Sequence, residues 1–179
     1  MVAAEGVWVL DMSRLKSLTS LRIERCWAYC YGDDVHGLSN LTDLNIIGCE
    51  NFSFYRFSCI PIFLLPALTT LNLTNCGHLE ELRCLSSFTA LTDLNLSGCW
   101  RLDVEELETL SSLAFLTNLN TLDLRCSADR PDPIELTDEA LRTLRSFTAL
   151  TTLYLGNCNL PEEGRPAGAA HRPPQPDDS

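Results

Sequence analysis

The chain has 179 residues, of which 45% are hydrophobic, so it carries enough apolar material to form a packed core and is not disordered as a whole. Its 24 acidic residues outnumber its 13 lysines and arginines, which gives a formal net charge of −11. Because nucleic acids and anionic membrane surfaces are bound through basic surfaces, this balance argues against both as partners.

Residues 1–17 form a short lead, within which Val7–Met12 has the composition of a degenerate strand. The lead has no basic region followed by an apolar run, as a secretory signal would have. No stretch of the chain approaches the roughly 18 apolar residues of a transmembrane helix. We therefore expect a cytoplasmic protein that does not enter a membrane.

A nine-residue pattern, Leu-x-x-Leu-x-Leu-x-x-Cys, recurs along the chain. It fits the segments LTSLRIERC (18–26), LTDLNIIGC (41–49), LTTLNLTNC (68–76), LTDLNLSGC (91–99) and LTTLYLGNC (150–158). The remaining copy, LNTLDLRC (119–126), is the fifth in chain order and has its cysteine one residue early, so we expect a distorted turn there. The leading leucines are 23 to 31 residues apart, which predicts about six stacked repeats over residues 18–160.

Alternation of side chains along a strand explains the pattern. The residues at positions 4 and 6, such as Leu94 and Leu96, point to the same side and form a core with the leading leucine. One copy cannot bury that side alone, so the copies must stack. The sequence predicts an α/β solenoid: an open curved parallel sheet, with helices, 3₁₀ turns and loops returning on its convex side.

Apolar residues between the strands predict the convex segments. They recur at every third position in Leu79, Leu82, Leu85 and Phe88, and again across Leu102–Leu116. Thr137, followed by acidic residues, predicts the start of another helix. Residues 127–135 read as a polar loop, and residues 161–179 as a disordered tail.

The segment at 50–67 is rich in aromatic residues and interrupted by two prolines. We expect its aromatics to be buried locally, with a convex contact site as the alternative. Nine cysteines without a secretion signal are unlike a disulfide framework. We expect the recurring cysteines to be reduced, buried thiols that act as small hydrophobes.

The sequence shows no catalytic, cofactor-binding or metal-binding pattern. His36, His78 and His171 are scattered, and neither a Cys-x-x-Cys pair nor a glycine-rich phosphate loop occurs. The acidic cluster around residues 103–108 falls on the solvated side of a predicted helix. We therefore expect a protein that is not an enzyme.

The nonamers resemble the cysteine-containing class of leucine-rich repeats found in F-box leucine-rich-repeat proteins. The segment ELTDEAL (135–141) resembles the helix opening that follows the cysteine in that class, and similar repeats occur in leucine-rich regulatory proteins of trypanosomatids. The resemblance covers residues 18–160. It implies a non-catalytic protein-binding module, similar to the substrate-recognition arm of ubiquitin-ligase receptors. A regulator of a signalling enzyme such as a cyclase, or a truncated fragment of the family without independent activity, is the alternative.

The residues at positions 3, 5 and 7 of each copy are predicted to face solvent on the concave side of the sheet. The predicted contacts with a partner protein are Asp43, Asn45, Asn72, Asp93, Asn95, Asp123 and Tyr154. The asparagines could equally form a purely structural side-chain ladder. We expect the three aspartates to be solvent-exposed and to favour a basic or hydrogen-bond-donating partner. Uncapped ends of the stack would allow weak self-association.

Overall fold

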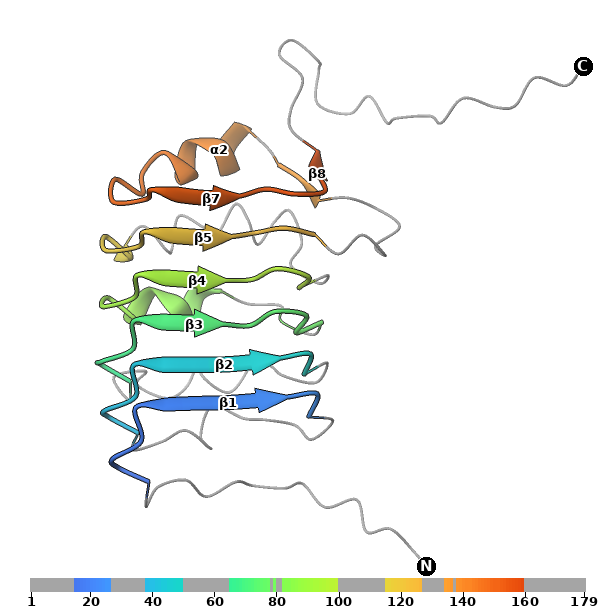
Figure 1. Ribbon diagram of the computed structural model, residues 1–179. Coiled ribbons are helices and arrows are strands. Elements are labelled where there is room, and N and C mark those ends of the chain that lie inside the picture. Colours follow the sequence, from blue (N-terminus) through green and yellow to red (C-terminus); the bar gives the residue numbers. More distant parts are fainter. Residues whose placement is uncertain are drawn as a thin grey trace, which may run out of the picture.

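The computed structural model describes residues 15–26, 38–49, 65–77, 79, 82–99, 115–126, 134–136 and 138–159. Six strands form one parallel sheet whose spatial order follows the chain. They are β1 (Ser20–Glu24), β2 (Asp43–Ile47), β3 (Thr70–Asn72), β4 (Asp93–Asn95), β5 (Thr121–Asp123) and β7 (Thr152–Tyr154). They lie above one another like rungs (Figure 1), which confirms the predicted open solenoid.

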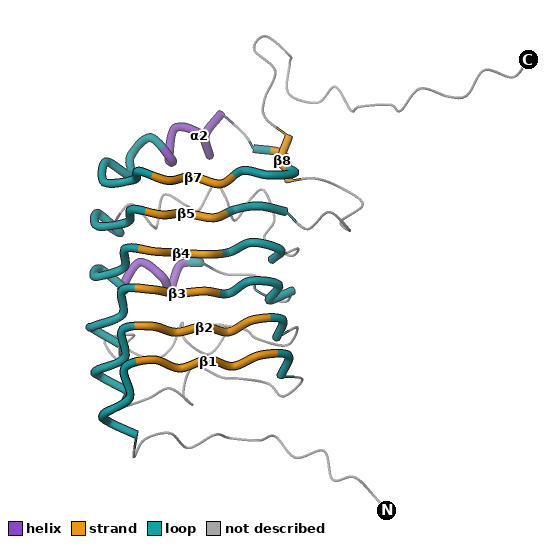
Figure 2. Tube along the Cα trace, in the orientation of Figure 1, coloured by secondary structure: helices purple, strands orange, loops and turns teal. Residues whose placement is uncertain are grey.

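The helices of the described return segments lie behind the sheet. The 3₁₀ helix η3 (Arg83–Ser87) and helix α2 (Asp138–Leu144) cover the same face of the strands (Figure 2). The predicted apolar residues Leu79, Leu82, Leu85 and Phe88 are all buried. Helix α2 begins where the sequence predicted a helix start. Among the residues that the structure describes, no helix is long and apolar enough to cross a membrane.

A second, two-stranded sheet pairs β6 (Ile134–Glu135) with β8 (Cys158–Asn159). The prediction of a loop over 127–135 is therefore wrong for its last two residues. The pairing joins segments more than twenty residues apart, and the amide of Leu136 extends it by donating to the Asn159 carbonyl. Such a non-local partner leaves no periodic signal in the short β6 sequence.

The repeat leucines fill the interior as predicted. In the fourth copy, Leu91, Leu94 and Leu96 are no more than 2% exposed. A tight turn precedes each of the six strands of the main sheet, because the amide of each leading leucine donates to the carbonyl three residues earlier. The residue at that earlier position is always apolar: Leu15, Leu38, Leu65, Phe88, Leu116 and Phe147.

A threonine hydroxyl also links neighbouring copies. Thr69 Oγ1 donates to the Thr42 carbonyl and Thr92 Oγ1 donates to the Thr69 carbonyl, both at 3.1 Å. Thr42 and Thr151 make the same contact with the copy before them. This explains the threonine that follows the leading leucine, a feature whose role the sequence alone did not indicate.

The recurring cysteines pack inward. Cys49, Cys76 and Cys99 are buried, and no disulfide joins any of the six cysteines whose side chains are described. The thiol of Cys76 donates to the Ile46 carbonyl at 3.3 Å, and the thiol of Cys99 to the Leu73 carbonyl at 3.0 Å. The prediction that the recurring cysteines are mostly buried is confirmed for these residues, and their reduced state stays a prediction. The side chains of Cys30, Cys59 and Cys84 lie outside the described part.

A left-handed residue precedes the cysteine in five copies. These residues are Arg25, Gly48, Asn75, Gly98 and Asn157, with φ between 49° and 72°. A Cβ atom on Gly98 would lie 1.9 Å from the side-chain oxygen of Asn75, so glycine suits that position. The fifth copy has no left-handed residue, because Cys126 itself occupies this place. The expected distortion of that turn is confirmed.

Several predictions fall on residues that are not described. They concern the strand at Val7–Met12, the aromatic segment up to residue 64, the apolar helix before residue 115, the loop at 127–133 and the tail at 161–179. The domain boundaries at residues 17 and 160 likewise stay predictions.

Candidate binding surface on the sheet

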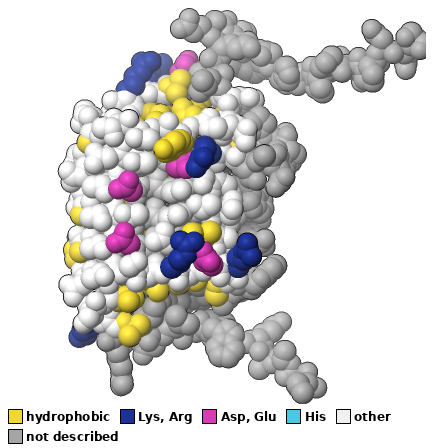
Figure 3. All heavy atoms as spheres, in the orientation of Figure 1, with side chains coloured by type: hydrophobic (Ala, Val, Ile, Leu, Met, Phe, Trp, Pro, Cys, Tyr) yellow, Lys and Arg dark blue, Asp and Glu magenta, His cyan; other side chains and the backbone are white. Residues whose placement is uncertain are grey.

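The strand register places all seven predicted contact residues on one face of the sheet, which we call the concave face. Five of them form a row across neighbouring strands: Asn45, Asn72, Asn95, Asp123 and Tyr154. Asp43 and Asp93 lie one row closer to the strand starts, on either side of Thr70. The face is mostly uncharged, with separate acidic side chains over the starts of the strands and basic side chains nearer their ends (Figure 3).

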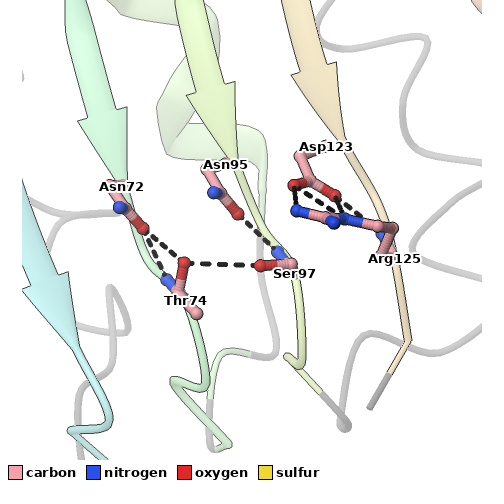
Figure 4. Close-up of polar contacts among 6 residues, drawn as sticks. All are labelled: Asn72, Thr74, Asn95, Ser97, Asp123 and Arg125. Carbon is pink, nitrogen blue, oxygen red and sulfur yellow. Dashed lines mark hydrogen bonds and ion pairs between the residues drawn. The ribbon is translucent and has the colours of Figure 1, made fainter. Parts of the chain in front are cut away.

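Two asparagines of the row, Asn72 and Asn95, hydrogen-bond along their own strands. The Oδ1 atom of Asn72 accepts the amide of Thr74 at 3.0 Å and its hydroxyl at 2.6 Å. Asn95 Oδ1 accepts the amide of Ser97 at 2.9 Å, and the Thr74 and Ser97 hydroxyls are 3.3 Å apart (Figure 4). Within the described part of the chain, neither Nδ2 group has a partner. Both amides are in register, as expected, and their donors remain available.

The two aspartates near the strand starts keep their charge exposed to a partner. Thr42 donates its hydroxyl to Asp43 at 2.6 Å, and Thr92 donates to Asp93 at 2.7 Å. Neither carboxylate has an ion-pair partner among the residues that the structure describes. Because both side chains are only partly buried, their negative charge can act on a molecule that approaches this face.

Asp123 differs from this pair and corrects the prediction that all three aspartates are solvent-exposed. Its residue is only 4% exposed. Arg125 covers it, with Nη2 at 2.6 Å and Nε at 3.1 Å from Oδ2, and the Arg125 amide donates to Oδ1 at 3.1 Å. The hydrogen bonds that the Arg125 guanidinium donates to Asp123, followed by the negative charge of that carboxylate, raise the pKa of Arg125. Residues two apart on a strand share a face, which brings the two side chains together.

Tyr154 completes a cluster at the last strand. Its residue is 44% exposed, and the Arg125 guanidinium carbon lies 5.1 Å from the centre of its ring. The cluster of Asp123, Arg125 and Tyr154 therefore presents an aromatic ring and a fixed cation side by side. Sequence reasoning did not include Arg125 among the contact residues, although the Asp-x-Arg spacing was a usable signal.

An acidic and a basic residue two positions apart also form a pair on the first strand, β1. Arg22 and Glu24 form an ion pair, with Nε 2.7 Å from the Glu24 Oε1 atom, and both side chains are at least half exposed. This pair is another feature of the face that the predicted site left out. Among the described residues, no group of three His, Cys, Asp or Glu side chains is placed to hold a metal ion.

Comparison with known proteins gives a matching family model and matches among solved structures. A family model described as Zer-1-like leucine-rich repeats matches residues 62–177, which include four of the six copies. Fourteen chains among solved structures match. One is an internalin from Listeria monocytogenes, 16% identical, with a TM-score of 0.30; the match covers 83% of this chain and 63% of the internalin. No curated protein matched the chain.

Proposed function

The chain belongs to the Zer-1-like leucine-rich-repeat family, and on this premise we propose that it is a non-catalytic module that binds a partner protein on the concave face. Leucine-rich-repeat families typically bind proteins, and solenoids use their extended concave surfaces for this purpose. The chain is more than long enough to form such a surface, because six strands contribute side chains to it.

The observation that carries the proposal is the set of unused polar groups on this face. The carboxylates of Asp43 and Asp93 have no cation beside them, and the Nδ2 groups of Asn72 and Asn95 have no acceptor within the described structure. A partner that brings cationic groups to the aspartates and carbonyl or carboxylate oxygens to the amides would satisfy both sets.

The aromatic cluster at the last strand supplies a different kind of contact. Tyr154 offers a large, rigid surface with a polar end, the type of side chain enriched at energetically dominant interface positions. We infer that the aspartates steer a basic partner towards the face, whereas Tyr154 retains it once it is bound.

The narrower function follows from the resemblance to F-box-type repeats. We propose that the chain acts like the substrate-recognition arm of a ubiquitin-ligase receptor. A regulator of a signalling enzyme such as a cyclase is the second candidate, and a family fragment without independent activity is the third. Support for the first is the similarity of the repeats, including the 135–141 helix opening.

Affinity capture from cell extract, followed by quantitative mass spectrometry, tests the proposal. The baits are the wild type, the double variant Asp43→Asn with Asp93→Asn, and Asp138→Asn as a matched charge change on α2, away from the face. We expect a reproducible set of proteins with the wild type and Asp138→Asn, and at least a several-fold loss with the double variant. Equal capture by all three would contradict binding on the concave face. Ligase subunits or a signalling enzyme in the set would distinguish the narrower functions.

A further inference from the structure

The shortened fifth copy places two cysteines side by side at the last turn of the solenoid. Cys126 occupies the strand position that Gly98 and Asn157 fill in other copies. Its amide donates to the Gly156 carbonyl at 2.9 Å, as the Gly98 amide donates to the Arg125 carbonyl. Cys158 has the ordinary place one residue further along. The missing residue therefore turns Cys126 towards the thiol of the next copy.

The two sulfur atoms are in van der Waals contact. Cys126 Sγ lies 3.6 Å from Cys158 Sγ. The strand register places Cys126 opposite Asn157, so Cys158 lies one residue further along the neighbouring copy. Formation of a bond of about 2.05 Å would require the sulfurs to approach by about 1.5 Å, a movement that side-chain rotation can supply.

The other cysteines differ from this pair in burial, although Cys158 also donates its thiol to a carbonyl of the copy before it, that of Leu124, at 3.5 Å. Cys49 Sγ accepts the amide of Cys26 at 3.4 Å, and the deeper Cys76 and Cys99 donate their thiols to carbonyls of the copy before them. Cys158 is only partly buried, whereas Cys76 and Cys99 are buried in the core. The last pair is thus close together and accessible from solvent through Cys158.

We propose that Cys126 and Cys158 form a reversible disulfide by exchange with a low-molecular-weight disulfide such as oxidised glutathione. The Cys158 thiolate attacks one glutathione sulfur, which forms a mixed disulfide and releases a glutathione thiolate. The Cys126 thiolate then attacks the Cys158 sulfur and releases the second glutathione. Two cysteine thiols are oxidised, one glutathione disulfide is reduced to two thiols, and the two cysteine protons pass to the released thiolates.

The bond would fasten the last repeat to the fifth. The closed loop runs from Cys126 to Cys158 and contains β6, α2 and β7. Strand β7 carries Tyr154 and is the last strand of the sheet. Oxidation would therefore restrain the end of the sheet that bears the aromatic cluster, and this inference does not depend on the identity of a partner.

Peptide mapping of the full chain tests the proposal. The native protein is equilibrated in a series of oxidised and reduced glutathione mixtures, quenched with acid, alkylated in denaturant and digested. We expect a peptide pair that joins Cys126 to Cys158, about 2 Da lighter than the two separate thiol peptides and separated by dithiothreitol. Cys76 and Cys99 should be recovered as alkylated thiols.

Two variants give the expected intermediate and the control. Cys126→Ser should accumulate Cys158 as a mixed disulfide with glutathione, because no thiol remains to release it. Cys26→Ser, a change at the half-buried cysteine of the first copy, should leave the Cys126–Cys158 link unaltered. The proposal is overturned if both thiols of the wild type remain alkylatable throughout the series, or if Cys158 links to another cysteine instead. The peptide map of the wild type tests the proposal even if a variant fails to fold.

Discussion

Asp123 shows how one neighbouring side chain changes the role of an acidic residue. Asp43 and Asp93 occupy the face with only a threonine hydroxyl against them, whereas Asp123 lies beneath the Arg125 guanidinium. Its carboxylate also accepts the Arg125 amide, so it holds the backbone at the end of β5. Asp123 therefore stabilises the fold, while the other two aspartates remain available to a partner.

Replacement of Asp123 by alanine should destabilise the fold. The change leaves the Arg125 amide without its acceptor and removes a buried acceptor, a loss of about 1 to 3 kcal/mol. Asp43→Ala, which removes only a contact with Thr42, should change the free energy of unfolding by less than about 0.5 kcal/mol. Urea unfolding followed by circular dichroism compares the two. Similar midpoints for both variants would mean that the contacts of the buried Asp123 carboxylate with Arg125 do not stabilise the fold in solution.

At the scale of the element, buried cysteines follow the ends of neighbouring strands. Three of them are Cys49, Cys76 and Cys99. Burial raises the pKa of Cys76 from 9.0 to about 12, and burial likewise raises that of Cys99 to about 12. Burial also raises the pKa of Cys49. These thiols fit the interior only in their protonated form, so folding and thiol ionisation are coupled.

The coupling predicts a loss of stability at alkaline pH. In the unfolded chain the thiols ionise above about pH 9, but in the native state Cys76 and Cys99 hold their protons to about pH 12. Their contribution is therefore fully present below pH 9 and is lost as the pH rises towards 12, at up to about 1.4 kcal/mol per pH unit for each thiol. Urea midpoints between pH 8 and 10.5 measure this slope. The variant Cys99→Ala should have a shallower slope, and an unchanged slope would contradict the coupling.

The stacked strands also predict a gradient of burial along the solenoid. Leu94 in the centre is 1% exposed, whereas Leu153, the equivalent residue of the last strand, is 38% exposed. Leu94→Ala should cost about 2 to 5 kcal/mol because it loses buried contacts and leaves a cavity. Leu153→Ala should cost clearly less, since it removes side chain that is already partly in water. Thermal unfolding of the pair checks the order, and a larger effect at Leu153 would show that the strand positions are misassigned.

At the scale of the whole molecule, the two edge strands of the described sheet carry incompletely buried core positions. Leu15, before β1, is 50% exposed, and Leu153 of β7 is 38% exposed. We expect weak self-association through these edges, since an edge strand with exposed apolar residues favours pairing. Sedimentation velocity across a concentration series should show a rising average mass, which Leu153→Gln should suppress. A strictly monomeric wild type at high concentration would rule this association out.

The sequence predicted the sheet because its leucines repeat with the alternation of a strand and, in five of the six copies, at a constant distance from the cysteine. Residues such as Leu94 and Leu96 have the same role in every copy, so periodicity alone identifies them. Asp123 was misjudged because its burial depends on where the Arg125 side chain lies, which periodicity does not encode. Strand β6 was missed because its partner, β8, is distant in sequence. Both failures concern contacts specific to one copy of the repeat.

Site-specific photo-crosslinking tests the central claim most directly. A benzophenone amino acid is placed at Asn45 or Tyr154 on the concave face, and at the exposed Arg145 after α2 as the control. After irradiation in cell extract, we expect covalent adducts with the same protein from both concave positions and none from Arg145. Adducts that form only from Arg145, or none from either position on the sheet, would contradict the account that this face binds the partner.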